Sequence, residues 1–106
     1  MYKIVLVRFP FTEKAGYKLR PALMLTDLHG KYNTVLVAYI TSKDSDGSSL
    51  DIKIKQSKKN KLSKDLYINI YKITNIVQSA LKGELGELTD NETKEVKTKL
   101  KKMFEL

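Results

Sequence analysis

An arginine followed by a proline is the first feature of this sequence that could carry chemistry. Arg20 and Pro21 stand directly in front of the apolar run of residues 22–25. Proline has no amide hydrogen and biases the residue before it toward extended geometry, so it is tolerated at the first position of a strand. The pattern predicts an extended Arg20 at the mouth of a strand, where its guanidinium offers a planar fork of donors suited to phosphate.

A second apolar run ends in hydroxyl groups. Residues 33–41 are typical of a strand, and Thr41, Ser42 and Lys43 stand where it ends. Hydroxyls can donate to a phosphate oxygen or accept from a ribose 2′-OH. If Arg20 and Thr41 are neighbours in the fold, they form a small site for a phosphoryl group. Ordinary strand-to-loop punctuation also explains Thr41 and Ser42, and from the pattern alone it is the commoner explanation.

Other catalytic chemistry is sparse. The single histidine, His29, precedes Gly30 and is better explained as a turn residue than as a catalytic one. No set of His, Cys, Asp and Glu has metal-ligand spacing, and residues 44–47 (DSDG) lack the third acid and the terminal glutamate of a calcium loop. There is no phosphate-cradling glycine loop and no nucleophile elbow. We therefore expect a site that uses no metal and no cofactor.

The composition indicates one globular domain over residues 1–106. The chain is 42% hydrophobic and 30% charged, which is ordinary for a protein with a single modest core. It contains no cysteine, which favours a cytoplasmic location. Its apolar runs are short of the ~20 residues of a membrane helix, so no membrane association is expected.

The positive charge is concentrated in one segment. The net charge is +8, and residues 52–64 hold six lysines and no acid. Such a segment fits a nucleic acid backbone or an acidic protein partner. A lysine-rich surface without any partner explains it equally well, because the chain has eighteen lysines and only two arginines. Charge alone does not decide between these readings.

Apolar periodicity predicts the elements that must position these residues. Residues 3–9, 21–26, 33–41, 50–55 and 67–73 are expected to be strands. A helix is expected over residues 90–104, because Thr89 and Glu92 form a capping-box pattern ahead of an apolar stripe. Residues 75–81 are expected to hold a short helical turn. The fold class is mainly β with added helices (α+β), a small barrel-like antiparallel sheet with a C-terminal helix.

The order of these pieces resembles the PemK/MazF family of toxins from type II toxin–antitoxin modules. The resemblance rests on FPFT after the first strand, RPALML in the second, ITSK after the third, and GELTDNE at the start of the helix. It covers essentially the whole chain. Each motif is weak alone, and their order and spacing make the signal fairly strong.

The resemblance implies an SH3-like β-barrel of the CcdB/MazF/PemK type that acts as a homodimer. It implies a metal-independent endoribonuclease that cleaves single-stranded mRNA at short sequences and is silenced by an acidic antitoxin. The family's catalytic arginine corresponds to Arg20, and its catalytic hydroxyl corresponds to Thr41, with Ser42 beside it. Residues 71–74 read YKIT where one branch has Glu-Gln-Ile-Arg. The second arginine is therefore missing, and the match is closer to the PemK-like branch.

Further residues are expected to bind RNA or move protons on this reading. Tyr17 could stack on a base, although a packed loop tyrosine is an equally good explanation. Glu13 is a candidate acid or base, and a solvated loop acid explains it as well. The residues expected to follow the RNA backbone are Lys18, Lys43, Lys53, Lys55, Lys58 and Lys59. Two alternatives stay open: a CcdB-like DNA-gyrase poison that acts by protein binding, and a non-catalytic nucleic-acid-binding barrel.

Overall fold

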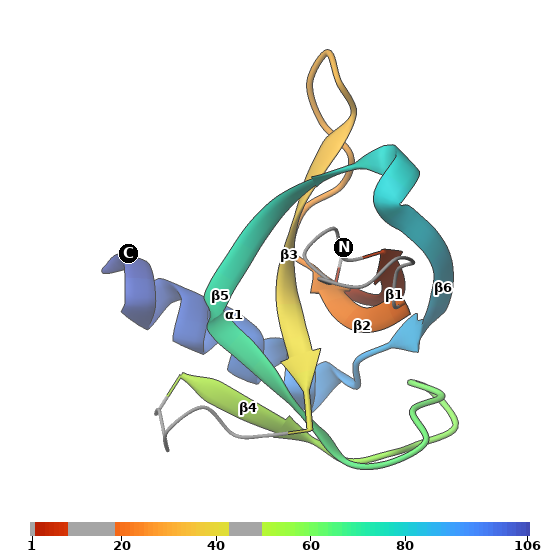
Figure 1. Ribbon diagram of the computed structural model, residues 1–106. Coiled ribbons are helices and arrows are strands. Elements are labelled where there is room, and N and C mark those ends of the chain that lie inside the picture. Colours follow the sequence, from red (N-terminus) through yellow and green to blue (C-terminus); the bar gives the residue numbers. More distant parts are fainter. Residues whose placement is uncertain (1, 9–18, 43–49) are drawn as a thin grey trace.

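The computed structural model describes residues 2–8, 19–42 and 50–106, which form a curled sheet with a helix packed against it (Figure 1). The elements in chain order are β1 (Lys3–Arg8), β2 (Leu19–Met24), β3 (Thr34–Thr41), β4 (Asp51–Ile54), β5 (Leu66–Val77), the 3₁₀ turn η1 (Gln78–Ala80), β6 (Leu81–Glu87) and α1 (Asp90–Phe104). No helix of the described ranges is long and apolar enough to cross a membrane.

The sheet is antiparallel and open. Its strand order is β4-β5-β3-β2-β1-β6, so β4 and β6 are its two edges within the described residues, and the expected closed barrel does not form there. The curl arises in the long strand β5. Ala38 pairs with Ile73 whereas Tyr39 pairs with Asn69, so β5 bulges at residues 70–72. A bulge bends and twists its strand, and the chain then curves through η1 into β6 (Figure 1).

Both faces of the sheet are apolar near its centre, which explains the long apolar runs of the sequence. On one face, side chains of β1, β2, β3, β4 and β5 form the larger cluster with Val96 of α1; we call this the helix face. On the other face, a smaller cluster joins β1, β2 and β3; we call this the opposite face. The opposite-face cluster comprises Val5, Val7, Ala22, Val35 and Val37.

The helix α1 has the bounds that its capping signals predict. The Thr89 hydroxyl accepts a hydrogen bond from the Glu92 amide at 3.2 Å, and the Glu92 carboxylate accepts one from the Thr89 amide at 2.9 Å. Val96 is fully buried in the larger cluster, where removing such a side chain from water contributes about 1.5–3 kcal/mol. The helix thus covers one face of the sheet.

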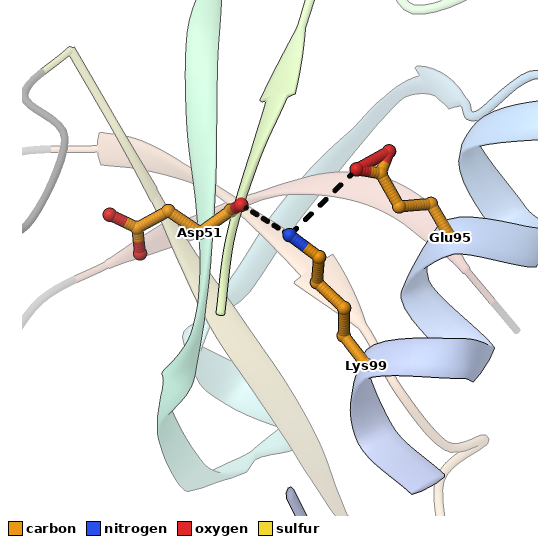
Figure 2. Close-up of polar contacts among 3 residues, drawn as sticks. All are labelled: Asp51, Glu95 and Lys99. Atoms are coloured by element: carbon orange, nitrogen blue, oxygen red, sulfur yellow. Dashed lines mark hydrogen bonds and ion pairs between the residues drawn. The ribbon is translucent and has the colours of Figure 1, made fainter. Parts of the chain in front are cut away.

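A lysine of α1 also ties the helix to β4. Lys99 Nζ donates to the Asp51 carbonyl oxygen at 2.9 Å and lies 3.9 Å from Glu95 Oε1 (Figure 2). A charge-assisted bond of this kind is stronger than a neutral one. It fixes the first residue of the short edge strand β4 against the helix.

Four elements differ from the sequence predictions. The strand β6 was not predicted, and β5 continues to Val77 rather than ending near residue 73. The helical turn expected over residues 75–81 is limited to Gln78–Ala80. The strand β2 begins at Leu19, so Pro21 lies inside the strand and not at its first position.

Candidate functional site

Pro21 is tolerated inside β2 because the strand is paired on one side only at that point. Toward β1, Pro21 is opposite Leu6. Toward β3, the ladder runs from Ala22 to Met24 and stops before Pro21. Proline is acceptable in a strand where its missing amide hydrogen faces no partner strand. The proline therefore marks the place where β2 and β3 separate, and Arg20 lies just beyond it.

The pairing of β2 with β3 brings the two predicted strand ends together. Ala22 is opposite Tyr39 and Leu23 is opposite Ala38. Continuing the same register past Pro21 places Arg20 opposite Thr41. Side chains alternate between the faces of a strand, so Arg20 shares the opposite face with Ala22, and Thr41 shares it with Val37. The guanidinium and the hydroxyl thus project from neighbouring positions on the same face.

A pocket of about 400 Å³ lies at these strand ends. The sheet supplies a polar part, which consists of Arg20, Thr41 and Ser42. The apolar part is lined by Leu6, Pro21, Ile40, Leu62, Leu66 and Leu85. Lys61, Ser63 and Lys64 reach it from the connection between β4 and β5. Its described lining contains three cationic side chains and no carboxylate, so the pocket suits an anion such as a phosphodiester.

Asn60 organises the connection that carries Lys61 and Lys64. Its side chain is buried, its Oδ1 accepts from the amides of Ser57 and Leu62 at 3.0 Å each, and its Nδ2 donates to the Lys55 carbonyl at 2.8 Å. An asparagine side chain that bonds nearby backbone groups in this way satisfies amides and carbonyls that have no strand partner in a turn. Lys61 therefore lies in a hydrogen-bonded turn, and Lys64 follows it closely in the same connection.

Gly86 of β6 packs directly against the backbone of this turn. A Cβ at position 86 would meet the Lys59 carbonyl oxygen and would come within 2.9 Å of the Asn60 Cα. The amide of Glu87 donates to the same Lys59 carbonyl at 3.2 Å. Only glycine allows so close an approach of two backbones. The strand β6, which the sequence did not predict, therefore fixes the turn beside the pocket.

Four other lysines that were predicted to bind RNA lie outside the pocket. Lys53, Lys55, Lys58 and Lys59 are exposed and are not among the residues that line the pocket. Glu13, Tyr17, Lys18 and Lys43 lie outside the described residues. Sequence reasoning identified the basic segment without singling out Lys61 and Lys64. The turn-forming pattern Ser57-x-x-Asn60 was the available signal, because it sets which lysines point back toward the sheet.

No group of three or more His, Cys, Asp or Glu side chains within the described ranges could hold a metal ion. What the pocket offers instead is one guanidinium, two ammonium groups and three hydroxyls around an apolar floor. These groups can bind a phosphodiester and stabilise negative charge that develops on it.

Comparisons with known proteins agree with this architecture. A family model described as "PemK-like, MazF-like toxin of type II toxin-antitoxin system" matches residues 1–104. The fold is similar to that of the Mycobacterium tuberculosis toxin MazF-mt6, with a TM-score of 0.77 and 20% identity over 98% of this chain and 97% of that one. No curated protein matches the sequence.

A second solved structure with the same fold contains a bound partner. It is described as an endoribonuclease in complex with its cognate antitoxin from Mycobacterial species, with a TM-score of 0.71 and 18% identity over 99% of this chain and 93% of that one. At these identities the similarity establishes the shared fold.

Proposed function

This chain belongs to the PemK-like, MazF-like toxins of type II toxin–antitoxin systems, and we propose that it acts there as a metal-independent endoribonuclease on single-stranded mRNA. One observation carries the proposal. The register of β2 and β3 leads to Arg20 opposite Thr41, at a pocket that also holds Lys61 and Lys64. A phosphodiester bound there meets donors from three segments of the chain.

In the proposed reaction the ribose 2′-OH attacks the adjacent phosphorus. A bond forms between O2′ and phosphorus, the bond from phosphorus to O5′ breaks, and the products carry a 2′,3′-cyclic phosphate and a 5′-OH. Negative charge grows on the non-bridging oxygens in the transition state. Arg20 stabilises that charge through preorganised donors, and Thr41 orients the phosphate or the attacking hydroxyl. Ser42 adds a second hydroxyl at the same strand end.

The proton transfers are assigned to water. The 2′-OH loses a proton and the departing O5′ gains one. A guanidinium does not give up its proton in proteins, and the described pocket lining contains no carboxylate. Glu13, the acid considered from the sequence, lies outside the described residues.

An acidic antitoxin is the proposed protein partner. The net charge of +8 and the exposed lysines of the β4–β5 connection favour an acidic peptide. A protein with the same fold is described in complex with its cognate antitoxin, which supports this assignment. The proposed active form is a homodimer, as the resemblance to the family implies.

The test is an incubation of the purified full chain with single-stranded RNA in the presence of EDTA. Fragments with 5′-OH ends support the ribonuclease. Inhibition of DNA gyrase without RNA cleavage would instead support a CcdB-like poison. RNA binding without either activity would support a non-catalytic module. The chemistry of the new ends separates the proposed reaction from that of a contaminating metal-dependent nuclease.

A further inference from the structure

A row of four polar side chains crosses the sheet on its opposite face. Thr41 of β3 pairs with Tyr67 of β5, and Tyr67 pairs in turn with Lys53 of β4. Continuing the β2–β3 register past its last pair, Ala22 with Tyr39, places Arg20 beside Thr41 at the other end of the row. Adjacent paired strands lie about 4.8 Å apart, so the two steps from Thr41 to Lys53 span roughly 10 Å.

The burial of the flanking residues sets the direction of these side chains. Ile40, Ile52, Leu66 and Ile68 all belong to the larger cluster on the helix face. The residues that alternate with them therefore project from the opposite face. Arg20 and Lys53 are exposed, whereas Thr41 and Tyr67 are partly exposed. The row is thus an accessible strip with a cation at each end and an aromatic ring between Thr41 and Lys53.

A buried polar group lies beside the row on the same face. Asn69 lies two residues beyond Tyr67 on the same strand and is 2% exposed. Its Oδ1 is buried and has no hydrogen-bond partner among the described residues. Buried acceptors are normally paired, and an unpaired one needs an explanation such as a bound water or ligand. Because this oxygen is buried, an ordered water can satisfy it, and a base on the surface does not contact it directly.

The geometry points to Tyr67 as a positioning residue that stacks on a base next to the scissile phosphate, with Lys53 binding the following phosphate. This inference rests on the proposed function, and it identifies the path of the substrate beyond the pocket. The pocket lies at the ends of β2 and β3, where consecutive residues that alternate between the two faces line it, and the row begins at the same two residues, Arg20 and Thr41. A single strand gripped at these two residues therefore continues over Tyr67.

The chemistry of the row suits single-stranded RNA. A tyrosine ring offers a flat surface to any base, and base–aromatic stacking tolerates different sequences. Tyr67 is held within a paired strand and has few rotatable bonds, so little freedom is lost on binding. A lysine one strand further on binds a phosphate as a point charge. A duplex would not present its bases to the ring, so the strip selects unpaired RNA.

The experiment compares Tyr67→Phe with Tyr67→Val in the full chain. Both variants keep an apolar side chain suited to a strand, and only the first keeps the ring. The RNA is a short oligonucleotide that spans a cleavage site mapped with wild-type protein. A second version carries a 2′-deoxy residue at the cleaved position, so that binding is measured without cleavage.

We expect Tyr67→Val to weaken binding of the 2′-deoxy RNA and raise KM about 5- to 150-fold, the range that follows from the loss of one stacked base. We expect kcat to be nearly unchanged and Tyr67→Phe to resemble wild type. Wild-type binding and KM in Tyr67→Val would overturn the inference while leaving the nuclease intact. Wild-type protein that neither binds nor cleaves RNA would overturn the proposed function and this inference together.

A matched pair of lysine variants keeps the proposal testable if Tyr67→Val does not fold. Lys53→Gln removes the charge at the end of the row, and Lys82→Gln removes an exposed lysine from β6 at the other edge of the sheet. Lys53→Gln is expected to reduce the salt dependence of binding by about one phosphate contact. Lys82→Gln is expected to leave it unchanged. Equal effects of the two substitutions would contradict the path.

Discussion

Gly86 lies directly against Asn60, so that a Cβ at position 86 would come within 2.9 Å of the Asn60 Cα and would also meet the Lys59 carbonyl oxygen. The turn that carries Lys61 and Lys64 into the pocket is therefore built on the backbone of β6. The positions of these two cations therefore depend on the packing of the β4–β5 connection against β6.

Gly86→Ala is expected to displace this turn. Backbone atoms cannot move aside as a flexible side chain can, so we expect a loss of about 1–3 kcal/mol in the free energy of unfolding and weaker RNA binding. Gly83→Ala is the matched control, because nothing lies within 4 Å of a Cβ at that position of the same strand. Urea denaturation and RNA binding measure both effects. Equal stability of the two variants would contradict the close packing of Gly86 against the turn.

Asn60→Ala is expected to destabilise the same turn from within. The substitution removes the acceptor of the Ser57 and Leu62 amides, whose hydrogen bonds are partly buried, and the loss of one such hydrogen bond costs about 1 kcal/mol. Asn91→Ala, at an exposed position of α1, is the control and should change little. The measurement is the denaturant midpoint. A midpoint for Asn60→Ala equal to that of the control would show that the turn does not depend on this side chain.

Lys61→Gln combined with Lys64→Gln is expected to weaken RNA binding and to flatten its dependence on salt. Each phosphate contact with a single strand contributes about 0.7 to the slope of log K against log salt concentration. The loss of two contacts should therefore lower the slope by about 1.4. Lys101→Gln with Lys102→Gln removes the same charge from the exposed end of α1. If that control flattens the slope equally, net charge rather than the pocket governs binding.

Thr89→Ala is expected to lower stability without altering chemistry. It removes the hydroxyl that caps α1, which costs about 1 kcal/mol. Thr98→Ala, at an exposed position inside the helix, should be neutral or slightly stabilising because alanine has the higher helix propensity. Thermal melting separates the two variants. Cleavage at a temperature where both are folded should match wild type, and a large loss in Thr89→Ala would contradict a purely structural role.

The sequence predicted α1 fully and predicted that five of the six strands exist. The helix depends on local signals: a capping box and an apolar stripe, which are readable without the fold. The strand β6 has the sequence LKGELGE, and its glycines and charged residues are not typical of a strand. It is a strand because β1 provides a partner for it, and that pairing is tertiary.

The candidate site could likewise be predicted only in part. The residue types of Arg20 and Thr41, at the ends of two apolar runs, indicated a phosphoryl site before any register was known. The pocket lysines could not be distinguished from Lys53, Lys55, Lys58 and Lys59, because that choice depends on the turn at Asn60. Tyr67 was not identified either, since its neighbours Thr41 and Lys53 come from two other strands. Cross-strand neighbours depend on register, which local pattern does not specify.

The most direct test of the account is the single-turnover rate of RNA cleavage by Arg20→Ala in EDTA, measured beside Arg8→Ala, the chain's other arginine. Arg8 is exposed on β1 and is not among the residues that line the pocket. We predict that Arg20→Ala melts like wild type and cleaves roughly 10²- to 10³-fold more slowly, the usual cost of one transition-state donor, while Arg8→Ala stays within a few-fold of wild type. A folded Arg20→Ala protein that cleaves at the wild-type rate would contradict the assignment of this pocket as the active site.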